Sequence, residues 1–144
     1  MREAVAKRWL DRVSLPLEGI AEDSGPARAR LERYLRTLCA AKQNKVSEDP
    51  EMFMTYMTLA REACSVVKAY KEGLVDQIAA IISDGVKEGA FDVADVKASA
   101  RAIYEATIRY QHPAHAEEWK DPELAARFDA LLALLLRGLE ACKR

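Results

Sequence analysis

The chain has 144 residues, enough for one domain that buries about two thirds of the surface exposed by its unfolded chain. Half of the residues are hydrophobic, 31% are charged, and there are only six glycines and five prolines, which excludes a disordered chain and is typical of a compact, helix-rich protein. With a formal net charge of −1, the chain has no cationic field to attract nucleic acid, so it is not expected to bind DNA or RNA by itself.

The cysteines and the longest apolar run indicate where in the cell the protein is expected to lie. Cys39, Cys64 and Cys142 lack metal-type spacing and no signal peptide precedes them, which predicts a reducing, cytoplasmic setting. The longest uninterrupted apolar run, residues 130–136, has seven residues, whereas a bilayer-spanning helix needs about 20. We therefore expect no membrane partner.

The first predicted helix begins at Met1, where the apolar pattern is already helical and no capping residue precedes it. We therefore expect the chain to be cut from a longer one. Proline disfavours helical geometry in the residue before it, which predicts that this helix ends or kinks at Ser14–Pro16, followed by a loop through Gly25. Its apolar face comprises Val5, Trp9, Leu10 and Val13.

The middle of the chain predicts further helices. Ser24 can cap the next one, with Pro26 in its first turn. After a second entry signal at Ser47–Pro50, a helical pattern covers residues 52–88, and a break near Cys64–Lys68 is compatible with it although the sequence does not fix one. The helix after Ser24 has an apolar face of Leu31, Tyr34, Leu35 and Leu38.

A helix stop and a new helix start follow each other closely. Gly89 is placed as a left-handed stop, and Phe91 can fold back onto the last turn as in a Schellman cap. Asp92 is the predicted N-cap of the next helix, with Asp95 in its first turn, and that helix is expected to end before His112–Pro113.

The C-terminal part is expected to hold a loop with Trp119 and a last helix, residues 121–142, started by the cap at Asp121–Pro122. The sequence thus predicts five or six helices and no strand. The fold class is all-α, a multi-helix bundle forming a single domain over residues 1–144.

The last helix carries more apolar surface than one small domain can bury. One stripe at helical spacing is ordinary, but further leucines widen the apolar arc beyond the roughly 100° of a helix packed on one side. This surplus predicts two interfaces, a core on one side and a partner subunit on the other. The stripe is Leu124, Phe128, Leu131, Leu135 and Leu139, and the widening residues are Leu132, Leu134 and Leu136.

Catalytic and metal sites find little support. The group His112, His115, Glu117 and Glu118 could hold zinc, but a helix terminus and solvated charges explain it better. No serine or cysteine elbow, phosphate loop, dinucleotide fingerprint or paired Glu-x-x-His motif occurs. We expect neither an enzyme, a metal nor a cofactor.

Three short segments in the second half of the chain carry a family resemblance. The segment Gly85–Phe91, ending in a Gly-x-Phe turn before the capped Asp92 helix, resembles the C-terminal regulatory domain of TetR family transcriptional repressors. His112–Pro113 falls where many members end that helix, and the Arg-Gly-Leu ending at residues 137–139 is similar to the family's terminal helix. The resemblance covers nearly the whole chain and is strongest from residue 74 to residue 139.

The resemblance implies an N-terminal helix-turn-helix DNA reader, which nothing in this chain matches. Either the sequence is a fragment, which we favour, or it comes from a member without the reader. The resemblance also implies a homodimer, and operator DNA as a partner only through that missing N-terminal domain. A bound effector would change the separation of the two DNA-reading heads.

The resemblance further implies a pocket for a small apolar or amphipathic effector. Methionine and tyrosine suit an adaptable pocket, and plain core packing is the alternative explanation of the same residues. The predicted ligand-binding residues are Tyr34, Leu38, Phe53, Tyr56, Met57, Arg61, Tyr70, Tyr104, Thr107, Ile108 and Gln111.

The dimer implied by the resemblance would join two helices from each subunit in a four-helix bundle. Small residues on the Asp92 helix permit close approach beside the leucine-rich last helix, although alanine is also a good surface helix former. The predicted interface residues are Ala98, Ala102, Ala106, Leu131, Leu134, Leu135 and Arg137. The alternative functions are an all-helical dimeric adaptor that binds a partner helix without a small ligand, and an unrecognised enzyme.

Overall fold

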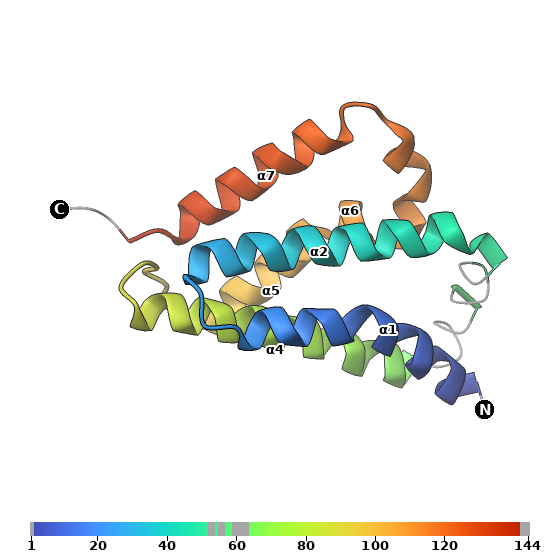
Figure 1. Ribbon diagram of the computed structural model, residues 1–144, viewed down its shortest axis with the longest axis horizontal. Coiled ribbons are helices and arrows are strands. Elements are labelled where there is room, and N and C mark those ends of the chain that lie inside the picture. Colours follow the sequence, from blue (N-terminus) through green and yellow to red (C-terminus); the bar gives the residue numbers. More distant parts are fainter. Residues whose placement is uncertain (1, 52–53, 55–56, 59–63, 142–144) are drawn as a thin grey trace.

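The computed structural model describes residues 2–51, 54, 57–58 and 64–141, and nearly all of them are helical. Helices α1, α2 and α4 lie side by side, α5 and α6 pack behind them, and α7 lies across α2 on the side away from α1 (Figure 1). The all-α prediction is confirmed. The helices are α1 (Arg2–Glu22), α2 (Ala27–Glu48), α4 (Cys64–Lys87), α5 (Val96–Ala106), α6 (Ile108–Gln111), the 3-10 helix η1 (Pro113–Lys120) and α7 (Leu124–Leu139).

Helix α1 continues through Pro16, so the predicted end of the helix at Ser14–Pro16 is wrong. A proline in a helix interior costs about 3 kcal/mol, whereas burying one large aliphatic side chain contributes about 1.5–3 kcal/mol. Val13 and Leu17, on either side of the proline, are both buried in the core, as is Ala21 one turn later. Tertiary packing therefore outweighs the local preference, and the expected loop shrinks to residues 23–26.

The start of α2 is held by a distant carboxylate instead of a local cap. Pro26 is the N-cap residue, and the backbone N–H of Ala27 donates to Glu88 Oε2 at 3.2 Å, so the predicted cap at Ser24 is wrong. The N–H of Ser24 donates to the Asp23 carboxylate at 2.8 Å. A negative charge at a helix N-terminus is favourable whichever part of the chain supplies it.

A buried arginine connects three helices at this end of the bundle. Arg30 of α2 is only 4% exposed. Its Nη1 pairs with Asp84 Oδ2 of α4 at 2.9 Å, Nη2 donates to the carbonyl of Ala21, and Nε lies 3.5 Å from the carbonyl of Ile20. The guanidinium thus satisfies the carbonyls left open at the end of α1, where a cation complements the helix dipole.

The end of α4 confirms the predicted Schellman cap. Gly89 has a φ of 79°, its N–H donates to Val86 O at 3.1 Å, and the N–H of Ala90 donates to Gly85 O at 2.9 Å. Phe91 folds back onto Gly85 so closely that a Cβ there would lie 2.1 Å from the ring. Gly85 is therefore required for this ring to pack on the helix.

Helix α5 begins later than predicted. Asp95, not Asp92, is the N-cap, and its side chain accepts from the N–H of Ala98 at 3.0 Å. Asp92 lies three residues earlier, in a short antiparallel contact between residues 90–92 and 139–141, where its N–H donates to Leu139 O at 2.9 Å. This contact fixes the C-terminal end of α7 against the turn after α4.

The remaining segments differ from prediction in their boundaries. The helix before His112 is divided at Thr107 into α5 and α6, and the predicted loop around Trp119 is the 3-10 helix η1. The last helix spans Leu124–Leu139 with Glu123 as its N-cap residue, and in the turn just before it the Asp121 side chain accepts from the N–H of Glu123 at 2.9 Å. Cys142 lies outside the described residues, and so does most of the segment 52–63. Helix α4 is continuous through residues 64–68, where the sequence is compatible with a break.

The core is formed by apolar side chains of α1, α2, α4, α5 and α7. None of the described helices is long and apolar enough to cross a membrane. The fully buried large side chains include Leu17, Leu31, Tyr34, Leu35, Leu38, Leu74, Ile78, Ile81, Ile82 and Leu132.

We predict that Arg30→Met destabilises the protein by about 2–3 kcal/mol, because it removes charge-assisted hydrogen bonds from a buried position. Arg28→Met is the matched control on the same helix, since Arg28 is half exposed and pairs with Glu140, and it should cost less than about 1 kcal/mol. Urea denaturation of both variants at equal protein concentration measures the difference. Equal losses would contradict the connecting role of Arg30.

Candidate functional site

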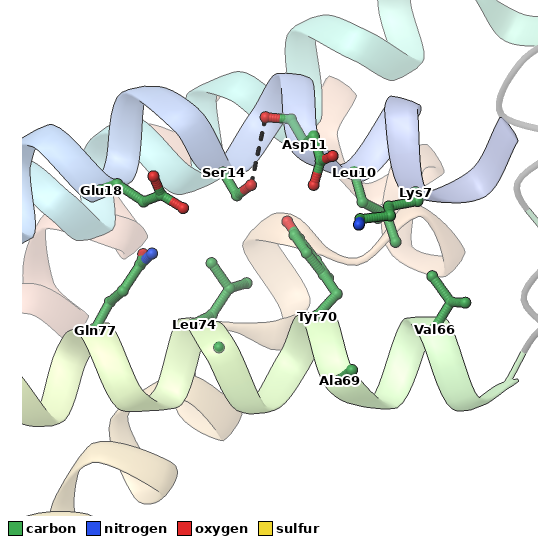
Figure 2. A pocket seen from close by; sticks show the side chains of 11 residues that line it. Lys7, Leu10, Asp11, Ser14, Glu18, Val66, Ala69, Tyr70, Leu74 and Gln77 are labelled. Atoms are coloured by element: carbon green, nitrogen blue, oxygen red, sulfur yellow. Dashed lines mark hydrogen bonds between the residues drawn. The ribbon is translucent and has the colours of Figure 1, made fainter. Parts of the chain in front are cut away.

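The candidate site is a half-open groove of about 340 Å³ between α1 and α4. Figure 2 shows side chains of the two helices facing each other across it. The volume falls at the lower end of the roughly 300–1,000 Å³ typical of small-ligand pockets. The groove is lined by Lys7, Leu10, Asp11, Ser14 and Glu18 of α1 and by Val66, Ala69, Tyr70, Gly73, Leu74 and Gln77 of α4.

The α4 wall is largely apolar and contains one open position. Tyr70 points from α4 toward α1, between Val66 and Leu74 (Figure 2). A Cβ added at Gly73 would meet no atom within 4 Å. The groove is therefore open at Gly73, where a side chain on α4 would occupy it.

One polar group on this wall is held in a fixed orientation. The hydroxyl of Tyr34, a fully buried residue of α2, donates to Gln77 Oε1 at 2.6 Å, and Leu74 O lies 3.4 Å away. Burial raises the pKa of Tyr34 far above its usual value, so the hydroxyl stays a donor. Tyr34 was predicted to contact ligand directly, but it is placed behind Gln77 and does not line the groove.

The α1 wall supplies the charges. Lys7, Asp11 and Glu18 lie on one side of α1, with Ser14 among them, and Figure 2 shows them facing α4. The Ser14 hydroxyl donates to Asp11 O at 3.3 Å within the helix. The groove thus has an apolar floor and a charged rim, an arrangement that suits an amphipathic or polar-ended ligand.

Behind Tyr70 lies a buried lysine. Lys42 of α2 is 4% exposed, and its Nζ is 4.6 Å from the centre of the Tyr70 ring. Burial, with a smaller contribution from the charge of Lys71, lowers the pKa of Lys42 to about 7. Burial also raises the pKa of the neighbouring Cys39 thiol to about 12, so this thiol is not a reactive one.

The structure separates the predicted ligand-binding residues. Tyr70 lines the groove, Met57 packs beside Leu10 and Val67 near one end of it, and Ile108 is partly buried against the core. Phe53, Tyr56 and Arg61 lie outside the described residues. The others belong to the closed core: Leu38, Tyr104, Thr107 and Gln111.

The buried polar pair of α5 and α6 has internal partners. Gln111 Nε2 donates to Thr107 Oγ1 at 2.8 Å, and Thr107 Oγ1 donates to Tyr104 O at 2.8 Å. This chain of bonds spans the break between the two helices at Thr107. Sequence reasoning missed Gln77, Leu10 and Ser14, and no local signal singles them out, because each lines the groove only through the pairing of α1 with α4.

Two further hollows lie on the other side of α2. One, of about 290 Å³, is under α7 and includes Cys39, Tyr110 and Phe128, and the other, of about 540 Å³, lies beside Trp119 of η1. Trp119 is tied in place because its Nε1 donates to Arg109 O at 2.9 Å. The α1–α4 groove remains the candidate site because it combines a predicted ligand residue with a polar group of fixed orientation.

The histidines around η1 serve the local structure. His112 Nδ1 accepts from the N–H of Ala114 at 3.1 Å, capping η1, and His115 Nδ1 lies 3.4 Å from Glu118 Oε2. Burial, then the charges of Lys71, Lys42 and His115, lowers the pKa of His112. Among the described residues, no three histidine, cysteine or acidic side chains gather as a metal site would require.

The predicted dimer residues lie on the surface of the single chain. Leu134 is 68% exposed, Leu131 and Leu135 are half-buried, and Arg137 is exposed. On the opposite side of α7, Leu132, Leu136 and Leu139 pack into the core. On α5, the buried face is Ala100, Ile103 and Tyr104, and the exposed face holds Ala98, Ala102 and Ala106.

The fold is thus an all-α bundle with a groove between α1 and α4. Residues 27–132, more than half of the chain, match the family described as Tetracyclin repressor-like, C-terminal domain. The chain therefore belongs to this family, the C-terminal domains of TetR-like transcriptional regulators. Comparison with curated proteins gives no match, and neither does comparison with solved structures.

We predict that Lys42→Met stabilises the protein relative to wild type most at pH 7 and below, and less as the pH rises toward 10.5. The folded-state pKa is lowered from 10.5 to about 7, so the unfolded chain binds more protons between these values and wild-type stability rises across that window. Urea denaturation over a pH series measures the gap.

Lys42→Arg is the control, because arginine keeps its charge throughout this range. The difference in free energy of unfolding between Lys42→Arg and the more stable Lys42→Met should not shrink as the pH rises. A difference in free energy of unfolding between wild type and Lys42→Met that stays constant with pH would contradict the lowered pKa of Lys42.

Proposed function

We propose that this domain binds a small apolar or amphipathic effector in the α1–α4 groove and forms a homodimer that controls a transcriptional regulator in the cytoplasm. The observation that carries the effector site is the Tyr34–Gln77 hydrogen bond, which fixes one polar group in an otherwise largely apolar wall. Pockets that bind small molecules combine these two elements.

The attachment of α1 suggests how binding would be transmitted. The C-terminal end of α1 is held by Arg30 through the carbonyls of Ile20 and Ala21, whereas the groove extends along the helix from Glu18 toward Lys7. A ligand between α1 and α4 would therefore tilt the N-terminal part of α1 about its fixed end. In an intact regulator, a DNA reader preceding α1 would move with it.

The size of this effect has a thermodynamic limit. A ligand shifts the balance between two arrangements only by the difference in its affinity for them. To raise the population of one arrangement from about 1% to about 99%, the ligand would have to bind that arrangement about 10⁴-fold more tightly than the other. Only groove contacts that the ligand makes in one position of α1 and not in the other would shift this balance.

We predict that Gly73→Leu raises the melting temperature and weakens ligand binding in the groove. The new side chain would enter open space, replace a helix-destabilising glycine and fill the site. The measurement is fluorescence titration with N-phenyl-naphthylamine, a neutral apolar probe, together with a melting curve. Binding should weaken by about tenfold or more, which corresponds to about 1.4 kcal/mol.

Gly19→Leu is the matched control. Gly19 is also a helical glycine with open space around its Cβ position, but it is exposed on α1 outside the groove. The control should keep wild-type affinity for the probe. Unchanged binding to Gly73→Leu would argue against the groove as the effector site.

The proposed dimer joins α5 and α7 to the same helices of a second copy. Support comes from the apolar residues that the fold leaves on the surface of α7, Leu134 above all, beside the half-buried Leu131 and Leu135. Covering such residues contributes about 25 cal/mol per Å² of apolar area removed from water. The exposed alanines of α5 permit close helix approach at the same interface.

We predict that Leu134→Glu converts the dimer to a folded monomer, since the new charge would be desolvated only in the interface. Leu15→Glu is the matched control, because Leu15 is 63% exposed on α1 and lies outside the proposed interface. Sedimentation velocity gives the mass of each variant. A dimeric Leu134→Glu, or loss of the dimer in Leu15→Glu, would refute this interface.

A further inference from the structure

Gln77 presents only one kind of polar atom to the groove. A tyrosine hydroxyl has one proton to donate, and the Tyr34 hydroxyl donates it to Gln77 Oε1 at 2.6 Å, because Leu74 O at 3.4 Å lies near the limit of a hydrogen bond. The oxygen of the amide is therefore used on the α2 side. Within the part of the chain that the structure describes, Gln77 Nε2 makes no hydrogen bond, so its two N–H groups remain as donors.

The surroundings of Gln77 determine which acceptor can use these donors. Figure 2 shows Gln77 extending from α4 toward Glu18 of α1, with Leu74 next along α4. A ligand atom held by Gln77 Nε2 would thus lie between an apolar floor and a carboxylate. An anionic head would be placed beside the negative charge of Glu18.

Distant cations do not compensate for this carboxylate. Lys7 and Glu18 are eleven residues apart on α1, about 16 Å along the helix, which is twice the screening length of about 8 Å at physiological salt. Lys42 is behind Tyr70, and Tyr70 is seven residues, or about 10 Å, from Gln77 along α4. The Gln77 end of the groove is therefore suited to a neutral acceptor.

We propose that Gln77 is the polar anchor of the groove and that the ligand is a small apolar molecule with a neutral carbonyl acceptor, such as an ester, ketone or amide. The carbonyl oxygen would accept from Gln77 Nε2, and the apolar body would extend along Leu74 and Tyr70 toward Val66. Tyr34 is the positioning residue, since it orients the amide without contacting the ligand. This inference rests on the proposed effector function of the groove.

Three probes with the same eight-carbon chain test the head group: methyl octanoate, octanoate and octylammonium. Isothermal titration calorimetry on the wild-type chain should give the tightest binding for methyl octanoate. One neutral hydrogen bond corresponds to a preference of about threefold to tenfold. A wild-type preference for octanoate or octylammonium would overturn the proposal.

Gln77→Glu isolates the donor. A carboxylate at this position can still accept the proton of the Tyr34 hydroxyl but has no N–H to offer, so binding of methyl octanoate should weaken about threefold to tenfold and that of octylammonium should strengthen. Unchanged binding of methyl octanoate would overturn the proposal. Far-ultraviolet circular dichroism of the variant confirms that it is folded.

Two more variants separate the roles of the neighbours. Tyr34→Phe removes the orienting bond, so it should weaken methyl octanoate binding while leaving octylammonium binding unchanged. Glu18→Gln removes the repelling charge, so it should strengthen octanoate binding and leave methyl octanoate unchanged. Equal effects of either variant on the probes would count against the assigned roles.

Gly73→Leu distinguishes failure of this inference from failure of the proposed function. If any of the three probes binds wild type and loses binding in Gly73→Leu, the groove is a ligand site whatever its preferred head group. If none of them binds in a Gly73-dependent manner, both the inference and the proposed effector function are overturned.

Discussion

The structure depends on the buried guanidinium of Arg30, because this one group closes the junction of three helices. It satisfies carbonyls at the end of α1, belongs to α2 and pairs with Asp84 on α4. A cation this deeply buried is tolerated only with charged and hydrogen-bonded partners around it. The positions of α1 and α4 relative to each other, and hence the groove between them, follow from this junction.

Several contacts near Arg30 fix the helices to one another at one end of the bundle. Glu88 caps α2 at Ala27, Phe91 packs onto Gly85, and residues 139–141 pair with residues 90–92. The groove begins beyond this end, where α1 and α4 face each other with a glycine in place of a side chain. The proposed effector response uses this contrast, since a helix fixed at one end can be tilted by a ligand near the other.

Elements governed by neighbouring residues could be predicted from the sequence. The stop at Gly89, the return of Phe91 and the buried face of α2 involve residues within a few positions of each other, so their periodicity and cap signals are local. Helix boundaries that depend on residues far away in the sequence could not be predicted. Pro16 lies inside a helix because of core packing, and α5 begins only after Asp95 because residues 90–92 pair with residues 139–141. Among the candidate site residues, Tyr70 was predictable as an aromatic at helical spacing.

The sequence by itself determined that the chain is all-α, that its last helix has more apolar surface than its own core covers, and that its residues resemble a TetR-like regulatory domain. Only the tertiary structure decided which helices form the groove and what Gln77 can do there. Helical periodicity reports on residues three or four positions apart, whereas the hydroxyl that orients Gln77 belongs to a helix 43 positions earlier. Packing brings these two groups together, and their chemistry then follows.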